Sequence, residues 1–276
     1  MQRMTAMPKL VESPEPRVAA RPLRLLTYNI HSCIGTDRRV SVERVAEVIA
    51  ACVPDVVALQ EVDVGRARTG GADQAAEIAR LLGMESHFHA ALRRGDEAYG
   101  VALLTALPAR RVKAGPLPGL AGRPGLEPRG ALWLAVEAGG AELQVITTHF
   151  GLHPAEQRAQ AAALAGPDWL GHPDCGGPAV LLGDFNAFPG SRPYRRLAAQ
   201  IADAQRAPAG RAGATFPSRL PLLRIDHVFA RGADVAAGAV MRSPLARLAS
   251  DHLPLAVDLA LAAAPAAART AERRAA

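Results

Sequence analysis

Short apolar runs alternate with amphipathic segments along most of this chain. Apolar residues at helical spacing predict helices after Ser41, near 73–82 and from Pro154 to about 165, with a further short helix near Pro193. The strand-sized apolar runs are 23–30, 55–62, 87–91, 99–104, 131–137, 142–149, 179–184, 224–230, 234–241 and 254–261. This mixed order, with many antiparallel neighbours, predicts an α/β (α+β) fold in which sheets pack together and helices lie outside.

Local signals set the expected ends of these elements. Ser41 is a favoured N-cap residue, Pro54 prevents the first helix from continuing, and Gly83 is of the type that commonly follows a helix. The sequence Glu-Ala-Gly-Gly-Ala-Glu at 137–142 predicts a hairpin between the two strands beside it.

A single domain, large enough for an enzyme, is expected over 22–261. A chain of 276 residues is long enough to bury a large core. Residues 1–21 are interrupted by prolines and charges, and residues 262–276 are of low complexity, so both segments are predicted to be disordered tails.

The composition bears on the kind of binding partner and on the cellular compartment. The net charge of +6 and the pI of about 9.9 would suit a polyanion, yet all basic residues except Lys9 and Lys113 are arginines, scattered among alanines. Three widely spaced cysteines form no disulfide framework or zinc motif. No leader-like or membrane-spanning apolar run is evident, which predicts a cytoplasmic protein and leaves peripheral membrane contact open.

Polar side chains recur where the apolar runs end. They interrupt or end these runs and are Asn29, His31, Glu61, His149, Asp184, Asn186, Asp226, His227, Asp251 and His252. Taken singly, each has an ordinary explanation: Asp184 and Asn186 fit a turn that bonds the backbone. His149 fits a buried core histidine, and Asp251 fits an N-cap or a turn. Their recurrence favours a site at one end of the sheets, where rigid strands present side chains to an open crevice.

This set of residues suits metal-assisted hydrolysis of a phosphoester. Proteins usually hold Mg²⁺ with one or two carboxylates, together with waters and substrate oxygens. We therefore expect Glu61 to be a direct ligand, with Asp251 and Asn29 completing its shell. The histidines lack the spacing of a zinc site. An aspartate at the attacking water, with an amide and imidazoles at the phosphate, would meet the remaining needs of the reaction.

Taken in order, these segments resemble the endonuclease/exonuclease/phosphatase superfamily, which includes deoxyribonuclease I. The segments are "LLTYNIH", "DVVALQEVD", "TTHFG", "LLGDFNAFPGS", "RIDHVFA" and "ASDHLPLAVDL". The resemblance implies a four-layered sandwich, with two mixed β-sheets packed face to face and helices on the outer faces. It also implies hydrolysis of phosphoester bonds with Mg²⁺ or Mn²⁺.

The resemblance implies a role for each matching position. Glu61 is similar to the family's metal-binding glutamate, Asn29 to an asparagine near the metal, and Asp251 to a second acidic metal contact. Asp184 is similar to the aspartate that orients or deprotonates the water. Asn186 is similar to the amide that holds a phosphate oxygen.

Three histidines and their partners complete the implied site. His149 is similar to a histidine that contacts the phosphate or assists the leaving group, and Asp226 and His252 resemble an aspartate–histidine pair. Whether the water-orienting aspartate or His252 is the general base stays open. His31 departs from the pattern of the superfamily's AP endonucleases, which carry an aspartate there, so a second metal site of their type is not implied.

We also expect three residues to contact the substrate: His31, Tyr99 and Arg129. This expectation rests only on their positions in the sequence. Arg129 fits a structural role equally well. Val101 fills a place that is often polar in the family.

Three functions compete at this point. A phosphodiesterase or phosphatase that acts on a small molecule or a lipid headgroup is favoured, because only 4% of residues are aromatic and no dense basic stripe accompanies them. A metal-dependent DNA or RNA nuclease is the alternative, and a non-catalytic binding protein on the same fold is the third. The sequence does not indicate the oligomeric state.

Overall fold

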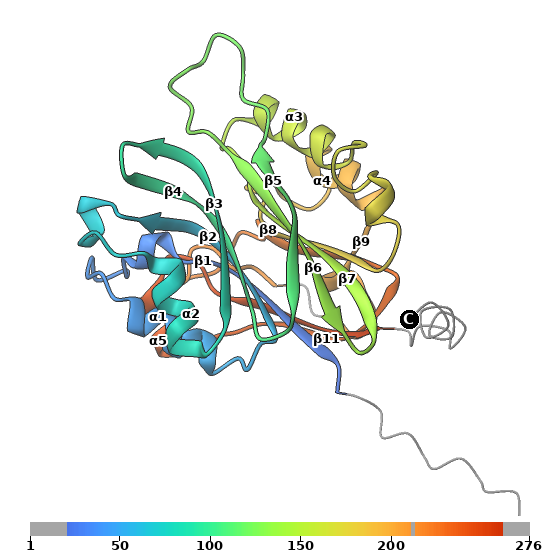
Figure 1. Cartoon of the computed structure of the whole chain (residues 1–276), viewed down its shortest axis with the longest axis horizontal. Helices are drawn as coiled ribbons and strands as arrows, with labels where there is room; N and C mark the ends of the chain where they lie inside the picture. Colours follow the sequence, from blue (N-terminus) through green and yellow to red (C-terminus); the bar gives the residue numbers. More distant parts are fainter. Residues whose placement is uncertain (1–20, 211–212, 262–276) are drawn as a thin grey trace, which may run out of the picture.

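Two six-stranded sheets lie face to face between two layers of helices (Figure 1). This four-layered α/β sandwich is the predicted architecture. The computed structural model describes residues 21–210 and 213–261. The disordered tails predicted for 1–21 and 262–276 lie outside these residues, except Arg21, which forms an ion pair with Asp55.

The first sheet has the strand order β11-β12-β1-β2-β4-β3. Only β1 and β2 are parallel neighbours in it, and the helix between them packs on its outer face. Its strands are β1 (Leu23–Asn29), β2 (Val56–Val64), β3 (Glu85–Arg94), β4 (Glu97–Thr105), β11 (Ala233–Val240) and β12 (Leu255–Leu261). The helices on its outer face are α1 (Val42–Ala50), α2 (Gln74–Leu82) and α5 (Pro244–Ala249).

The second sheet repeats this plan with the order β5-β6-β7-β8-β10-β9. Its single parallel pair is β7–β8, again joined through a helix on the outer face. Its strands are β5 (Ala109–Pro116), β6 (Gly130–Ala138), β7 (Ala141–His149), β8 (Ala179–Asp184), β9 (Ala202–Asp203) and β10 (Asp226–Arg231), and its helices are α3 (Pro154–Leu164) and α4 (Arg192–Ala198). Short 3₁₀ turns span His31–Cys33, Ala67–Thr69, Pro173–Cys175 and Ala204–Arg206.

The core follows from the alternation of side chains along each strand. In β1, Leu25 joins the apolar cluster between the sheets, whereas Leu26 joins the cluster under α1, α2 and α5. A third cluster fills the space between the second sheet and α3 and α4. Both faces of each sheet are therefore buried, which explains why the central strands read as continuous apolar runs.

The predicted N-cap of α1, the glycine after α2 and the hairpin are confirmed, whereas α1 ends at Ala50, ahead of Pro54, and Val53 has a φ of +49°. The Ser41 hydroxyl accepts a hydrogen bond from the Arg44 backbone at 3.1 Å, and Gly83 follows α2 with φ +66°. The segment 137–142 joins β6 and β7 as a hairpin. The apolar pattern did not predict β5, β9 or α5. No described helix is long and apolar enough to cross a membrane.

Candidate active site

Four polar side chains lie where the two parallel strand pairs approach each other. Asn29 is the last residue of β1, His149 of β7 and Asp184 of β8, while Glu61 belongs to β2. The Asn29 amide nitrogen donates to Glu61 Oε1 and to Asp184 Oδ2, both at 3.0 Å. One amide thus joins a carboxylate from each sheet, and the parallel pairs place their carboxyl ends around a shared site.

Glu61 reaches this site through a β-bulge. The expectation that Glu61 ends its strand is wrong, because β2 continues to Val64 and its pairing with β4 is interrupted between Leu59 and Val62. Glu61 lies in this interruption with φ +57°. A bulge redirects a side chain, and a positive φ in a non-glycine residue persists only where the surroundings enforce it. The strained backbone is therefore part of how the carboxylate is positioned.

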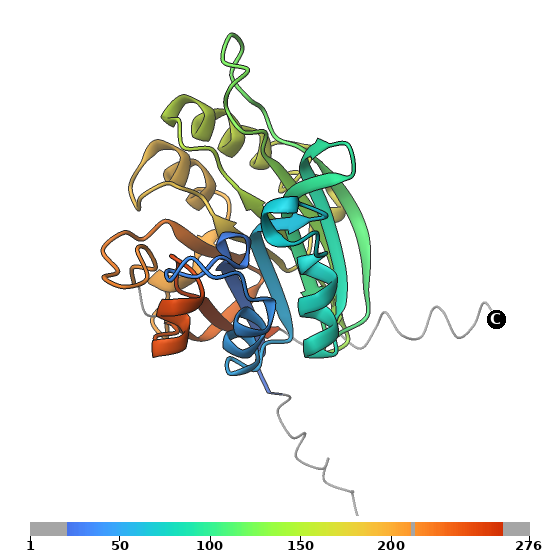
Figure 2. The same ribbon diagram turned by 90° about the vertical axis from the view of Figure 1, so that its left-hand side faces the viewer.

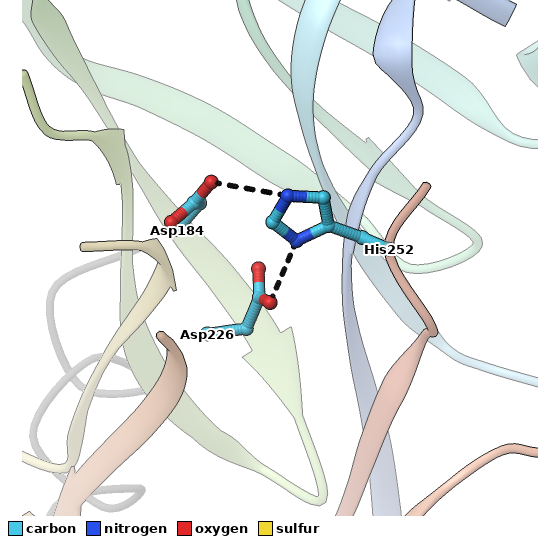
Figure 3. Close-up of side chains that lie close together, drawn as sticks. All are labelled: Asp184, Asp226 and His252. Carbon is cyan, nitrogen blue, oxygen red and sulfur yellow. Dashed lines mark hydrogen bonds and ion pairs between the residues drawn. The ribbon is translucent and has the colours of Figure 1, made fainter. Parts of the chain in front are cut away.

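A charged triad forms the centre of the site (Figure 3). Antiparallel pairing of β8 with β10 places Asp226 opposite Asp184. His252 lies with Nδ1 2.9 Å from Asp226 Oδ2 and Nε2 3.7 Å from Asp184 Oδ2. All three side chains are buried, and Thr215 donates a hydrogen bond to Asp226.

Burial and charge act on this triad in opposite directions. Burial opposes the charge on His252, but Asp226 and then Asp184 outweigh it and raise the pKa of His252 to about 10. Burial, followed by the charge of Asp226, raises the pKa of Asp184 above its usual value. The two carboxylates therefore favour a cationic imidazole, and Asp184 is a stronger proton acceptor than an ordinary aspartate.

His149 contacts the same aspartate in a different protonation state. An Arg129 nitrogen lies 3.0 Å from Nδ1 of His149, and a guanidinium can only donate hydrogen bonds. The Nδ1 atom must therefore accept, which leaves the proton on Nε2, 3.5 Å from Asp184 Oδ2. Burial, then the charge of Arg129, lowers the pKa of His149 well below its usual value. His149 is thus a neutral hydrogen-bond donor.

Asn186 is held by the turn that the Asp-x-Asn spacing suggested. Its backbone N–H donates to Asp184 Oδ1 at 2.9 Å, and its φ is +46°. Its side-chain nitrogen donates to the Phe150 carbonyl at 3.0 Å and lies 3.3 Å from His149 Nε2, where the two groups are neighbouring donors and not hydrogen-bond partners. The turn expected for this sequence is therefore present, and it fixes the side chains of Asp184 and Asn186 in the lining of one cavity.

These groups surround a single cavity of about 470 Å³. Among the residues singled out from the sequence, those that line it are His31, Glu61, Tyr99, Arg129, His149, Asp184, Asn186, Asp251 and His252. Asn29 and Asp226 lie behind this lining and bond to residues in it. The loop between β5 and β6, which ends at Arg129, projects from the molecule in Figure 1 and Figure 2.

The Endonuclease/Exonuclease/phosphatase family profile matches residues 26–252. The chain belongs to this family. Family members hydrolyse phosphoesters and generally use a divalent metal. The uncharacterized protein YbhP of Escherichia coli K12 is 33% identical over 141 residues, 50% of this chain and 54% of that protein. The chain thus spans about half the length of the curated relatives it matches.

Solved structures of family proteins share the fold. A family protein from Beutenbergia cavernae has a TM-score of 0.72 and 29% identity, covering 90% of this chain and 73% of its own. The mannosyl-6-phosphatase Bt3783 of Bacteroides thetaiotaomicron has a TM-score of 0.68 and 19% identity, covering 87% of this chain and 100% of its own.

Several residues of the cavity were not predicted. Arg68 lines the cavity, where its guanidinium donates to both carboxylate oxygens of Asp63 and to Ser32 Oγ. Glu127 lines the cavity and pairs with Arg129 at 2.7 Å. Arg68 lies in the 3₁₀ turn Ala67–Thr69 and Glu127 in the loop before β6. Neither segment shows an apolar period, so these positions carried no signal in the sequence.

The acidic residues fit a hard divalent cation. Glu61 and Asp251 line the same cavity. Glu61 accepts a hydrogen bond from Asn29, whereas the Ser250 hydroxyl, 3.4 Å from Asp251 Oδ1, donates its proton to the Asn29 carbonyl at 2.7 Å. Both carboxylates thus keep oxygen atoms that could bind Mg²⁺ or Mn²⁺. Asp184, Asp226 and His252 also bring ligand atoms within 4.8 Å of one another. The protonated imidazole of His252 already lies between the two carboxylates. The triad therefore fits a buried ion pair better than a cation-binding site.

Proposed function

We propose that this protein is a divalent-metal-dependent hydrolase of small-molecule or lipid-headgroup phosphoesters, which acts through an activated water. The observation that carries the proposal is the convergence of Asp184, cationic His252, neutral His149 and the Asn186 amide on one cavity with two partly open carboxylates. This combination provides a proton acceptor, hydrogen-bond donors for phosphate oxygens and ligands for a hard cation.

Asp184 is the proposed base for the water. Both ring nitrogens of His252 face carboxylates, which favours the doubly protonated ring and leaves it without a lone pair to accept a proton. We therefore assign the role of general base, which the sequence left open, to Asp184. His252 is assigned to stabilise the negative charge that develops on the phosphate.

His149 and Asn186 are assigned to the phosphate oxygens and the leaving group. The tautomer imposed by Arg129 keeps a proton on His149 Nε2 for donation. Glu61 and Asp251 would hold the metal, which when bound supplies a Lewis acid that polarises a phosphoryl oxygen. Asn29 bonds to Glu61 and Asp184 through its amide nitrogen and thereby sets their separation.

The test is hydrolysis of bis-p-nitrophenyl phosphate by the full chain with Mn²⁺ or Mg²⁺, with and without a chelator. Asp184→Asn and His252→Asn should each lower turnover by about 10²- to 10⁴-fold. Asp174→Asn and His172→Asn, which change the same residue types at exposed or half-exposed positions, should not. Activity like that of the unaltered protein in either site variant overturns the assignment.

Nucleic acid cleavage is the alternative that the same preparation can test. Two arginines line the cavity, Arg68 and Arg129, and each forms an ion pair with a carboxylate. This pairing reduces the net positive charge that could attract a polyanion. DNA and RNA should stay intact under conditions in which the small diester is hydrolysed. A protein that binds phosphoesters without turnover would instead be the non-catalytic alternative.

We also propose that the protein is cytoplasmic. Cys33, Cys52 and Cys175 are free and buried, which suits a reducing compartment. Fractionation of cells that express the full chain tests this assignment.

A further inference from the structure

Exposed apolar side chains gather around the mouth of the catalytic cavity. The described residues expose eight large apolar side chains, and five of them are here, exposed by 36% to 74%. We call these five the apolar rim: Leu152, Phe188, Leu220, Leu222 and Leu223. Leu152, Phe188 and Leu223 line the cavity, and the other two belong to the loop of Leu223. Such gathering marks an interaction site, since single exposed apolar residues are normally scattered.

The loop that carries the three leucines is held firmly in place. Phe216 pairs with Leu223 across its base, and the Ser218 hydroxyl donates to the Ser250 carbonyl at 2.7 Å. The Phe216 ring also lies 4.8 Å, centroid to centroid, from the His252 ring. Fixed hydrogen bonds at the base, together with leucines in solvent, indicate a surface built for contact.

Positive charge flanks the apolar rim. A neighbouring hollow of about 320 Å³ shares Leu152, Asn186 and Phe188 with the catalytic cavity. Its described lining includes the exposed residues Arg158 and Arg192 and no carboxylate. Neither arginine forms an ion pair within 21–210 and 213–261. The catalytic amide therefore lies between an apolar surface and unpaired cations.

We propose that the apolar rim, with Arg158 and Arg192, docks on a phospholipid bilayer and places the cavity mouth against the lipid headgroups. This inference rests on the proposed function and narrows its substrate class to phosphoesters embedded in a bilayer. Leucine and phenylalanine side chains insert at the boundary between headgroups and acyl chains, and arginines pair with lipid phosphates.

Two other binding partners fit the apolar rim less well than a bilayer does. A second copy of the chain seated on the apolar rim would cover the mouth of the cavity and exclude substrate. A nucleic acid would need aromatic faces for its bases, and Phe188 is the single aromatic residue of the apolar rim.

Flotation of the full chain with vesicles tests the docking surface. The protein should float with phosphatidylcholine vesicles that contain phosphatidylglycerol, and the Leu220→Ser, Leu222→Ser double variant should partition about tenfold less. The matched control is Val53→Ser with Leu81→Ser, which removes two exposed apolar side chains elsewhere and should float like the unaltered protein. Both double variants should keep hydrolysis of bis-p-nitrophenyl phosphate, because none of these residues lines the cavity.

Two further variants address the mode of contact. Arg158→Gln with Arg192→Gln should remove the preference for vesicles that contain the anionic lipid. Leu222→Trp should keep flotation, and its fluorescence should shift to shorter wavelength on vesicles. The native Trp133 and Trp169 are buried and should contribute a constant background.

The results separate the docking surface from the catalytic site. No flotation, or equal flotation of the unaltered protein and the leucine variant, overturns the docking proposal even if the soluble diester is hydrolysed. A dimer that the leucine variant dissociates, or DNA binding that it abolishes, also overturns it in favour of those partners. Flotation that depends on the leucines, without hydrolysis of any diester, supports docking and refutes the proposed function instead.

Discussion

Three buried histidines near Asp184 differ in what faces their rings. His252 lies between two carboxylates and is held as a cation, whereas His149 faces a guanidinium and is held neutral. His227, next to Asp226 on β10, points to the opposite side of the strand and donates from Nε2 to the Ala187 carbonyl at 2.8 Å. The partner of each ring comes from a distant part of the chain, so the sequence could nominate these histidines but could not assign their protonation.

His227 should make the folded protein sensitive to acid. Burial lowers its pKa from 6.5 to about 4. Between these pH values the unfolded chain binds a proton that the folded protein does not, so the free energy of unfolding falls as the pH falls through this window. The loss is about 1.4 kcal/mol for each pH unit.

Urea unfolding at about pH 7 and pH 5 measures this effect. His227→Gln keeps a donor for the Ala187 carbonyl and should lose about 2 kcal/mol less than the unaltered protein on acidification. His172→Gln, at a half-exposed side chain, is the control and should track the unaltered protein. Equal acid sensitivity in all three proteins would contradict the prediction.

At the scale of elements, apolar periodicity predicted the strands of the first sheet and the main helices, but it missed both edge strands of the second sheet and the short helix α5. β5 is an edge strand that carries Arg110, Arg111 and Lys113, and edge strands commonly bear such charges. β9 has two residues and α5 has six, too few for a period to show. The bulge at Glu61 arises from pairing with β4, a contact that no local pattern encodes.

Gly183 controls how closely β7 and β8 approach behind the site. A Cβ atom at this position would overlap the Thr148 carbonyl oxygen, which is backbone and cannot turn away. Gly183→Ala should therefore force the strands apart, destabilise the fold by about 1–3 kcal/mol and separate His149 from its register partner Asp184.

Thermal unfolding and diester turnover should both fall in Gly183→Ala. Gly177→Ala is the matched control, because a Cβ atom there meets nothing within 4 Å and the backbone is not left-handed. Native stability with full turnover in Gly183→Ala would show that the strands tolerate a wider separation.

For the whole molecule, the site exists only when the two sheets are packed together. Asn29 bonds across the interface to Asp184, and below it Gln60 accepts from Thr27 at 3.3 Å and donates to Thr147 at the same distance. Buried polar contacts of this kind are satisfied in one alignment of the sheets. The sequence nominated most members of the candidate site because they interrupt apolar strands or flank them, but supporting residues such as Thr215 and Arg68 become recognisable only in this packed state.

Metal binding should consequently stabilise the entire fold. A ligand that binds only the folded state at about 100 times its dissociation constant adds about 2.7 kcal/mol. For a domain of this size that energy raises the melting temperature by roughly 5–10 °C. Because Glu61 and Asp251 are far apart in the sequence and line one cavity only after folding, the unfolded chain lacks the site, and saturating Mn²⁺ should produce this rise.

Calorimetry of the full chain, titrated with Mn²⁺ after treatment with a chelator, measures the rise without any substrate. Glu61→Gln should abolish it, whereas Glu47→Gln, at an exposed position on α1, should leave it unchanged. Removing a carboxylate from the site also relieves repulsion in the metal-free protein, so the variant should melt no lower than the unaltered protein in chelator. A rise that survives in Glu61→Gln would place the cation elsewhere and leave Glu61 as a strained residue without its proposed ligand.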